Sequence, residues 1–196
     1  MGRYAKDSGG GDFQQAPTGN HLARCVRIYD LGTQREEYEG KVSVREKLIV
    51  TWELPNEPMD DGKPFIVSRF YTNSLSSKAT LRADLENWRG KTFTNEELGG
   101  FDLNSIVGKP CMISVVHTDA GKARVGGIAA LPKGMQCPLA VNEAFSYWIA
   151  EHNPLIYEKI SDGIKKFIEQ SAEWKERLSS PVKAAGIEGL DDDIPF

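Results

Sequence analysis

The side chains best suited to chemistry in this sequence are cations and aromatic rings that alternate with apolar residues. In the stretch FIVSRFYT, a core-facing Ile66 and Phe70 would leave Phe65, Arg69 and Tyr71 together on the opposite face, because side chains alternate along a strand. Arginine and lysine contact phosphates, and aromatic rings stack on bases. This mixture therefore predicts a surface that holds a single nucleic-acid strand.

Two earlier stretches have the same alternation. In VSVREKLIVTWEL, the residues Val44, Leu48 and Val50 share one face with the core residue Trp52, and HLARCVRIYDL has Val26 and Ile28 facing inward. The intervening side chains then face outward, beside those of the first stretch. The predicted DNA-contacting residues are Arg27, Tyr29, Arg45, Lys47, Phe65, Arg69 and Tyr71, and a more distant extension of the track comprises Arg24, Lys109, His117, Lys122 and Arg124. The alternative is that these are solvated charges and half-exposed rings, which are ordinary on any sheet.

Catalytic motifs are missing from the sequence. The histidines His21, His117 and His152 lie far apart, and there is no GxSxG, Walker-type GKS/T, HExxH or CxxC pattern. The pair Asp60-Asp61 lies in a turn rich in proline and glycine, where acids usually only solvate the chain. We therefore expect neither an enzyme nor a protein with a metal or a cofactor.

Composition and charge describe an ordinary globular chain with one unusual segment. The 196 residues are 40% hydrophobic and 27% charged, and no apolar run approaches the length of a membrane span. The net charge is −4, but four of the 28 acidic side chains lie in residues 188–196, which contain no base. The remainder has 24 acidic and 24 basic side chains and is neutral. The acidic excess therefore belongs to this last segment alone.

The spacing of apolar residues predicts a mainly β protein with helices, of the α+β class. We divide it into a flexible N-terminal segment (1–19), a strand-rich domain (20–134), a helical extension (135–178), and a linker with an acidic tip (179–196). The strand-rich domain has the order of an oligonucleotide/oligosaccharide-binding (OB) fold, a five-stranded Greek-key barrel with a helix between its third and fourth strands. The expected strands are 21–31, 42–54, 65–72, 108–118 and 122–131, and the expected helix is 74–90, ending at Gly90.

The extension, residues 135–178, is predicted to be helical. Residues 142–151 favour a short helix, and residues 153–180 place apolar side chains along one stripe. Either this stripe packs on the barrel or it joins two copies of the chain. The stripe comprises Ile156, Ile160, Ile164, Phe167, Ile168, Ser171 and Trp174.

The hexapeptide DDDIPF resembles the C-terminal tip of bacterial single-stranded DNA-binding proteins. Those proteins join an OB barrel to a tail that recruits other proteins, so the resemblance implies a partner-binding role here. Apolar side chains behind three acids fit a pocket flanked by cations, and a proline limits the entropy lost on docking. A solubilising acidic end would explain the three acids but not the apolar residues. The residues concerned are Asp191, Asp192, Asp193, Ile194, Pro195 and Phe196.

The strand-rich part resembles phage-encoded single-stranded DNA-binding proteins, through ARCVRIYDLGTQ, LIVTWELP, LRADLENWRGKTFT and IVGKPCMISVVH. The resemblance implies coating of single-stranded DNA during phage replication, recombination or repair, in the cytoplasm of the bacterial host. The bacterial family has a long linker before its tip, whereas here a helical segment intervenes, so the bacterial tetramer is not carried over. The competing hypotheses are an interaction adaptor that binds no nucleic acid, and a nuclease with acids around a metal.

Overall fold

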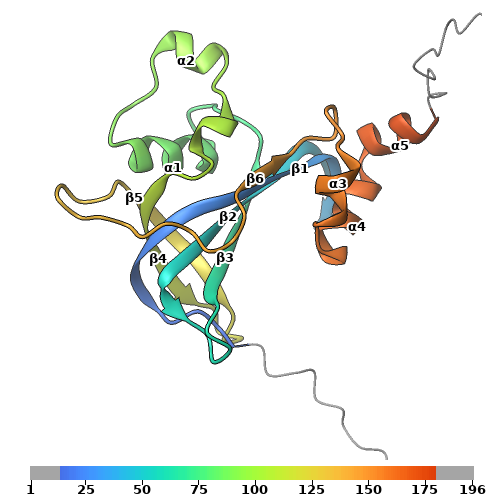
Figure 1. Cartoon of the computed structure of the whole chain (residues 1–196). Coiled ribbons are helices and arrows are strands. Elements are labelled where there is room, and N and C mark those ends of the chain that lie inside the picture. Colours follow the sequence, from blue (N-terminus) through green and yellow to red (C-terminus); the bar gives the residue numbers. More distant parts are fainter. Residues whose placement is uncertain (1–13, 180–196) are drawn as a thin grey trace, which may run out of the picture.

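The computed structural model describes residues 14–179, and within them six strands form one sheet (Figure 1). Its order is β3-β2-β1-β4-β5, antiparallel throughout, and β6 pairs with β1 in parallel. The fold is mixed α+β and dominated by the sheet, as predicted. The strands are β1 (Gly19–Tyr38), β2 (Lys41–Pro58), β3 (Pro64–Thr72), β4 (Pro110–His117), β5 (Ala123–Ala129) and β6 (Phe145–Tyr147).

The sheet is open along its path. The end strands β3 and β5 contact each other, but no ladder of hydrogen bonds joins them among residues 14–179. Two irregularities in β1 insert Val26 and Leu31 as extra residues opposite β2, and such bulges bend and twist a strand. Gly126 is the extra residue of β5 opposite β4.

Helix α1 (Thr80–Arg89) packs on the inner side of the sheet and contacts β3 and β5. Its residues Leu81, Leu85 and Trp88 are buried at the spacings that the sequence predicts. Gly90 ends the helix in a left-handed conformation (φ 66°), which glycine adopts without strain. Two short turns, α2 (Asn95–Gly99) and the 3₁₀ helix η1 (Leu103–Ile106), follow before β4.

The extension differs from the predicted pair of helices. Residues 145–147 form β6 rather than part of a helix, and the long stripe is divided among α3 (Pro154–Glu158), α4 (Asp162–Gln170) and α5 (Ala172–Ser179). The Ser171 hydroxyl accounts for one break, because it donates to the Ile168 carbonyl and accepts from the Trp174 amide.

The apolar stripe nevertheless packs on the sheet, as the first of its two interpretations predicts. Ile160, Ile168 and Trp174 form a second core with Tyr29 and the apolar residues beside it on β1 and β2. This second core lies on the outer face of the sheet, opposite the main core under α1 (Figure 1). Both faces of the sheet are therefore covered in part.

Residues 130–144 form a strap that leads from β5 to β6 and crosses the outer face. The fully buried carboxylate of Glu53 accepts hydrogen bonds from the backbone amides of Val141 and Asn142, both at 2.8 Å. It also accepts one from the Asn142 side chain at 2.7 Å. Three donors thus replace the water that this charge would otherwise keep.

Candidate nucleic-acid interface

Arg24, a predicted contact residue, holds the strap instead of facing solvent. Its guanidinium donates hydrogen bonds to the carbonyls of Cys137 (2.8 Å), Pro138 (2.9 Å) and Gly108 (2.6 Å). Arg24 lies directly opposite Glu53 in the β1–β2 register. The two opposite charges of this cross-strand pair therefore bind the same strap: Arg24 donates to its carbonyls, and Glu53 accepts from its amides.

Arg27 and Tyr29 point outward as predicted but are covered by the extension. The Arg27 guanidinium lies 5.4 Å from the centroid of the Phe145 ring and donates to Asn142 at 3.4 Å. Tyr29 is only 3% exposed, and its ring meets the same phenylalanine edge-on at 5.9 Å. The extension therefore covers this part of β1.

The predicted orientation of β3 is wrong. Phe65 (8% exposed) and Tyr71 (3%) belong to the main core, whereas Ile66 and Phe70 face outward, with Phe70 53% exposed. The three residues predicted to share a face, Phe65, Arg69 and Tyr71, do so, but that face is the inner one. Large apolar side chains occupy both faces of this strand, so alternation alone does not say which face is buried.

Arg69 lies at the edge of the core, paired with an acid of α1. Its guanidinium is 2.9 Å from Asp84 Oδ2, and the Tyr71 hydroxyl donates to the same oxygen at 2.7 Å. Burial, reinforced by the neighbouring Asp84 charge, raises the pKa of the Tyr71 hydroxyl. The phenol thus remains a neutral hydrogen-bond donor, and Arg69 keeps its charge near the surface.

A groove at the far edge of β3 gathers four of the predicted residues. It encloses about 540 Å³ between the ends of β2 and β3 and the loop that leads to α1. Four cationic side chains line it, and no acidic residue is among its lining residues. We call this the cationic groove; its lining residues are Arg45, Lys47, Arg69, Phe70, Tyr71, Thr72, Ser74, Ser76, Lys78, Ala79 and Thr80.

The four cations differ in how far they are already neutralised. Lys47 pairs with Glu36 at 2.9 Å, and Arg69 pairs with Asp84. Arg45 and Lys78 have no ion-pair partner within residues 14–179. An anion in the groove would therefore meet two uncompensated positive charges, with two more close by.

Phe70 provides an aromatic surface at the same place. It is half exposed, and its ring meets the ring of Phe167 from α4 edge-on, at 5.5 Å between centroids. Phe167 is itself partly exposed. Two accessible rings beside four cations are the combination that binds a single strand by stacking and by phosphate contacts.

The other predicted residues lie elsewhere. Lys109, Lys122 and Arg124 are exposed but do not line the groove. His117, also exposed, has its Nε2 2.8 Å from the Ala16 carbonyl, next to the start of β1. The tip residues, Asp191 to Phe196, lie outside the described part of the chain.

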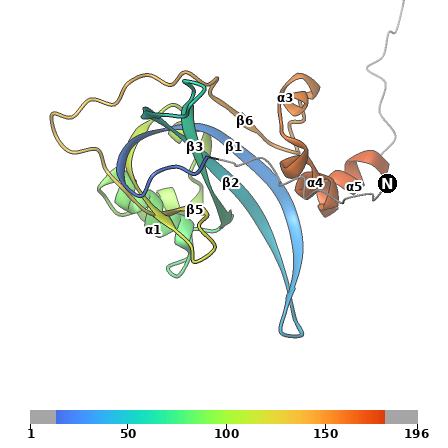
Figure 2. The same ribbon diagram turned by 90° about the horizontal axis from the view of Figure 1, so that it is seen from below.

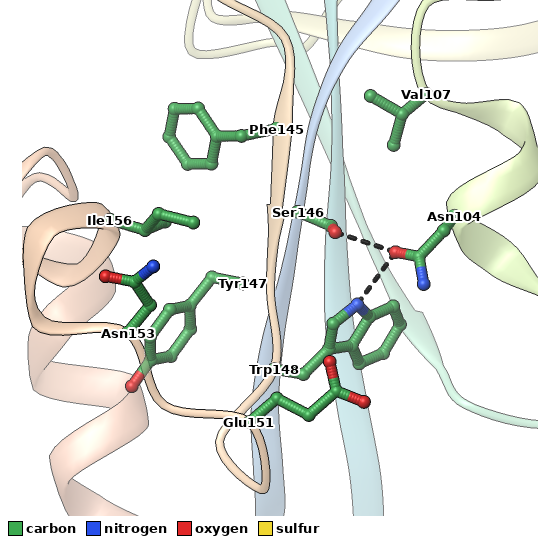
Figure 3. A pocket seen from close by; sticks show the side chains of 9 residues that line it. All are labelled: Asn104, Val107, Phe145, Ser146, Tyr147, Trp148, Glu151, Asn153 and Ile156. Atoms are coloured by element: carbon green, nitrogen blue, oxygen red, sulfur yellow. Dashed lines mark hydrogen bonds between the residues drawn. The ribbon is translucent and has the colours of Figure 1, made fainter.

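A second cavity, of about 410 Å³, lies between β6, η1 and α3 (Figure 3). Asn104 accepts hydrogen bonds there from the Ser146 hydroxyl (2.7 Å) and the Trp148 indole (2.8 Å), which anchors the segment after β6. Glu151 is the one charged residue of its lining. Without a cation, this cavity is a poor site for a phosphate.

Sequence reasoning missed Phe70, Lys78 and Phe167. Phe70 was assigned to the core, Lys78 to the first turn of the predicted helix 74–90, and Phe167 to an apolar stripe; in the structure α1 begins at Thr80 and Lys78 lies in the loop before it. The signal for Lys78 was present, because no acidic residue lies within four positions of it on either side to form a local ion pair. The proximity of Phe167 to Phe70 depends on tertiary packing and has no local signature.

Comparison with known proteins identifies no relative: no protein-family model, no curated protein and no solved structure matches this chain. Within residues 14–179, no cluster of three or more potential metal ligands occurs. No helix in that range is long and apolar enough to cross a membrane. The feature of the described residues that bears most directly on function is the cationic groove, with four cations and no acid in its lining.

Proposed function

We propose that this protein binds single-stranded DNA with little sequence preference and that the cationic groove is its binding site. The observation that carries the proposal is the half-exposed Phe70 in a groove with four cations and no acid. Stacking on a ring accepts every base, and contacts to phosphates are indifferent to sequence. Such a site binds a strand without sequence specificity.

The chain topology supports the proposal. Three antiparallel strands, a helix, and a hairpin whose first strand pairs back to β1 follow the order of an OB barrel, which binds oligonucleotides on the face of strands 2 and 3 and on the loops that join strands 1 to 2 and 4 to 5. The groove lies on β2, β3 and the loop after β3. We therefore assign the strand-rich part to an incompletely closed OB barrel.

The proposed biological role follows from the resemblances. The protein coats single-stranded DNA during phage replication, recombination or repair in the cytoplasm of the bacterial host. The DDDIPF segment recruits the proteins that act on this DNA. The competing function, an interaction adaptor, would use the same tip but leave the groove empty.

The test is a titration of the full chain with labelled oligo-dT and with a duplex of equal length, at two salt concentrations. We expect tighter binding to the single strand and weaker binding at the higher salt. Phe70→Ala should reduce the affinity for oligo-dT by about tenfold, since stacking contributes ~1–3 kcal/mol per base. Ile66→Ala, on the same face of the same strand, is the matched control and should have no effect.

Equal affinity for single strand and duplex would contradict the proposal. So would a Phe70→Ala variant that binds as well as the unmodified protein. Absence of any DNA binding would favour the adaptor, and metal-dependent cleavage of the oligonucleotide would favour the nuclease.

A further inference from the structure

The hairpin of β1 and β2 extends beyond the body of the molecule as an arm, residues 33–46 (Figure 2). A two-residue turn at Glu39 and Gly40 closes it, with φ values of 50° and 73°. Positive φ at both positions is the type I′ geometry whose twist matches that of a hairpin. The arm is therefore a continuous ladder rather than a loose loop.

The two faces of the arm differ. On the outer face, Gln34 donates to the Phe167 carbonyl of α4, Glu36 pairs with Lys47, and Arg45 lines the groove. These side chains are thus engaged with the body or with the proposed binding site.

At the base of the inner face, the Thr33 hydroxyl donates to Glu173 of α5 and Glu46 accepts from Asn73, but the inner face nearer the tip has no such engagement within residues 14–179. Val44 was expected to face inward, and it shares the face of the core residue Leu48 with Val42. Both valines lie past the end of the core, however, and Val42 is 49% and Val44 62% exposed. Arg35 lies directly opposite Val44 and Glu37 directly opposite Val42, and neither charge has an ion-pair partner within residues 14–179. We call these four residues the valine face.

The valine face is complementary to itself. Directly opposite residues of an antiparallel ladder share a face, so the four side chains occupy the corners of a rectangle, with the arginine and the glutamate on one strand and the valines on the other. A two-fold axis between two such faces, perpendicular to the strands, places Arg35 over Glu37 of a second copy and Val44 over its Val42. Both valine pairs and both charge pairs then match, as a closed two-fold interface requires.

We propose that the arm pairs, valine face to valine face, with the arm of a second copy of this chain. The face is far smaller than the ~1,200 Å² that stable interfaces bury, so the contact is weak in free solution. If the proposed function holds, a DNA strand that carries two copies raises their effective concentration and strengthens the contact. The arms would then link copies bound to the same strand.

Sedimentation of the full chain without DNA tests the pairing independently of the proposed function. The weight-average mass should rise above that of the monomer as the protein concentration increases. Val44→Asp should weaken this association by about tenfold or more, because it sets a charge against a valine of the second copy and draws Arg35 of its own arm away from Glu37 of that copy. Ser43→Asp, on the opposite face of the arm, is the matched control and should leave the association unchanged.

Charge exchange gives a second, sharper test. Arg35→Glu and Glu37→Arg should each weaken the association, because each sets like charges against each other across the axis. The double variant should restore it, since the exchanged pair is again complementary. Circular dichroism should show native secondary structure in every variant, because all four side chains are exposed.

Three results would overturn the pairing of arms. One is a chain that stays monomeric at all concentrations. Another is a double charge variant no better than the single ones. The third is a Val44→Asp variant that binds a short oligonucleotide less well, which would make the valine face a DNA contact. Failure of DNA binding alone would reject the proposed function and leave the mass measurements to decide the pairing.

Discussion

Within the cationic groove, the residues that should matter most for phosphate are those without a partner. An ion pair in the free protein must be given up or shared before its cation can contact a phosphate, so Lys47 and Arg69 start partly neutralised. Arg45 and Lys78 have no such cost within the described residues. The free cations should therefore dominate the salt dependence of binding.

We expect Arg45→Ala and Lys78→Ala each to weaken binding to oligo-dT by about fivefold at physiological salt. Each should also lower the slope of log affinity against log salt by about 0.7, the value for one lost contact to a single strand. Lys63→Ala is the control, because Lys63 is exposed, pairs with Asp61, and does not line the groove. Unchanged salt slopes in both groove variants would place the phosphates elsewhere.

Tyr71 is among the lining residues of the groove but is only 3% exposed, so it contributes to the fold rather than to the accessible binding surface. Its hydroxyl lies in the core and donates to Asp84, which also holds Arg69. Tyr71→Phe removes one hydrogen bond but leaves Asp84 its arginine, so the free energy of unfolding should fall by only about 1 kcal/mol. Urea denaturation measures this change.

DNA affinity provides the contrast for the same variant. Because the ring of Tyr71 is buried, the affinity of Tyr71→Phe for oligo-dT should equal that of the unmodified protein. A loss of affinity without a loss of stability would show that the hydroxyl reaches the DNA.

Among the elements, the strap depends on two residues at one cross-strand position. Arg24 takes its carbonyls and Glu53 its amides, so the strap is hydrogen-bonded along both sides of its backbone. It leads directly into β6, which pairs with β1 beside Arg27 and Tyr29 and sets the Phe145 ring against both side chains. The pair of Arg24 and Glu53 therefore positions the segment that covers this part of β1.

Glu53→Gln should destabilise the protein by about 3 kcal/mol. The substitution removes the charge that strengthens three hydrogen bonds and turns one acceptor into a donor that faces other donors. Chemical denaturation measures the loss. The control, Glu143→Gln, breaks an exposed ion pair with Lys159 and should cost no more than ~1 kcal/mol. Equal losses of stability in the two variants would show that Glu53 does not hold the strap.

The element order could be predicted from the sequence, but the burial of side chains could not always be. Helix α1 and the five long strands follow from clear periodicity and from caps such as Gly90. On β3, Phe65 and Phe70 are equally apolar, and the strand's orientation was decided by α1, which buries Tyr71 against Asp84. Which face of such a strand is buried can be decided only from a tertiary contact.

The extension shows the same limit in another form. The apolar stripe was correct as a buried surface, yet Ser171 divides its helix because its hydroxyl competes for backbone partners. Arg24 and Arg27 carry the same sequence signal as free cations such as Arg45. Whether an arginine meets solvent, a strap or a ring depends on residues more than a hundred positions away.

For the whole molecule, charge is segregated along the chain. Outside residues 188–196 the acids and bases balance, so the positive charge of the groove is a local property of a neutral body. Long-range attraction of DNA should be modest, and binding should depend on contacts within the groove. Against this background, we expect the four acids of residues 188–196 to compete with phosphates for the same cations.

Deletion of residues 191–196 should therefore leave the affinity for oligo-dT unchanged or raise it. The deletion removes three acids that compete with phosphates for the groove, and it removes no cation and no residue of the groove lining. The gain should be larger at low salt, because screening weakens this competition. Substitution of Ile194 and Phe196 by alanine keeps the acids and is the matched control, with unchanged DNA affinity. A loss of about tenfold on deletion would instead make the segment part of the DNA site, because removal of a mere competitor cannot weaken binding.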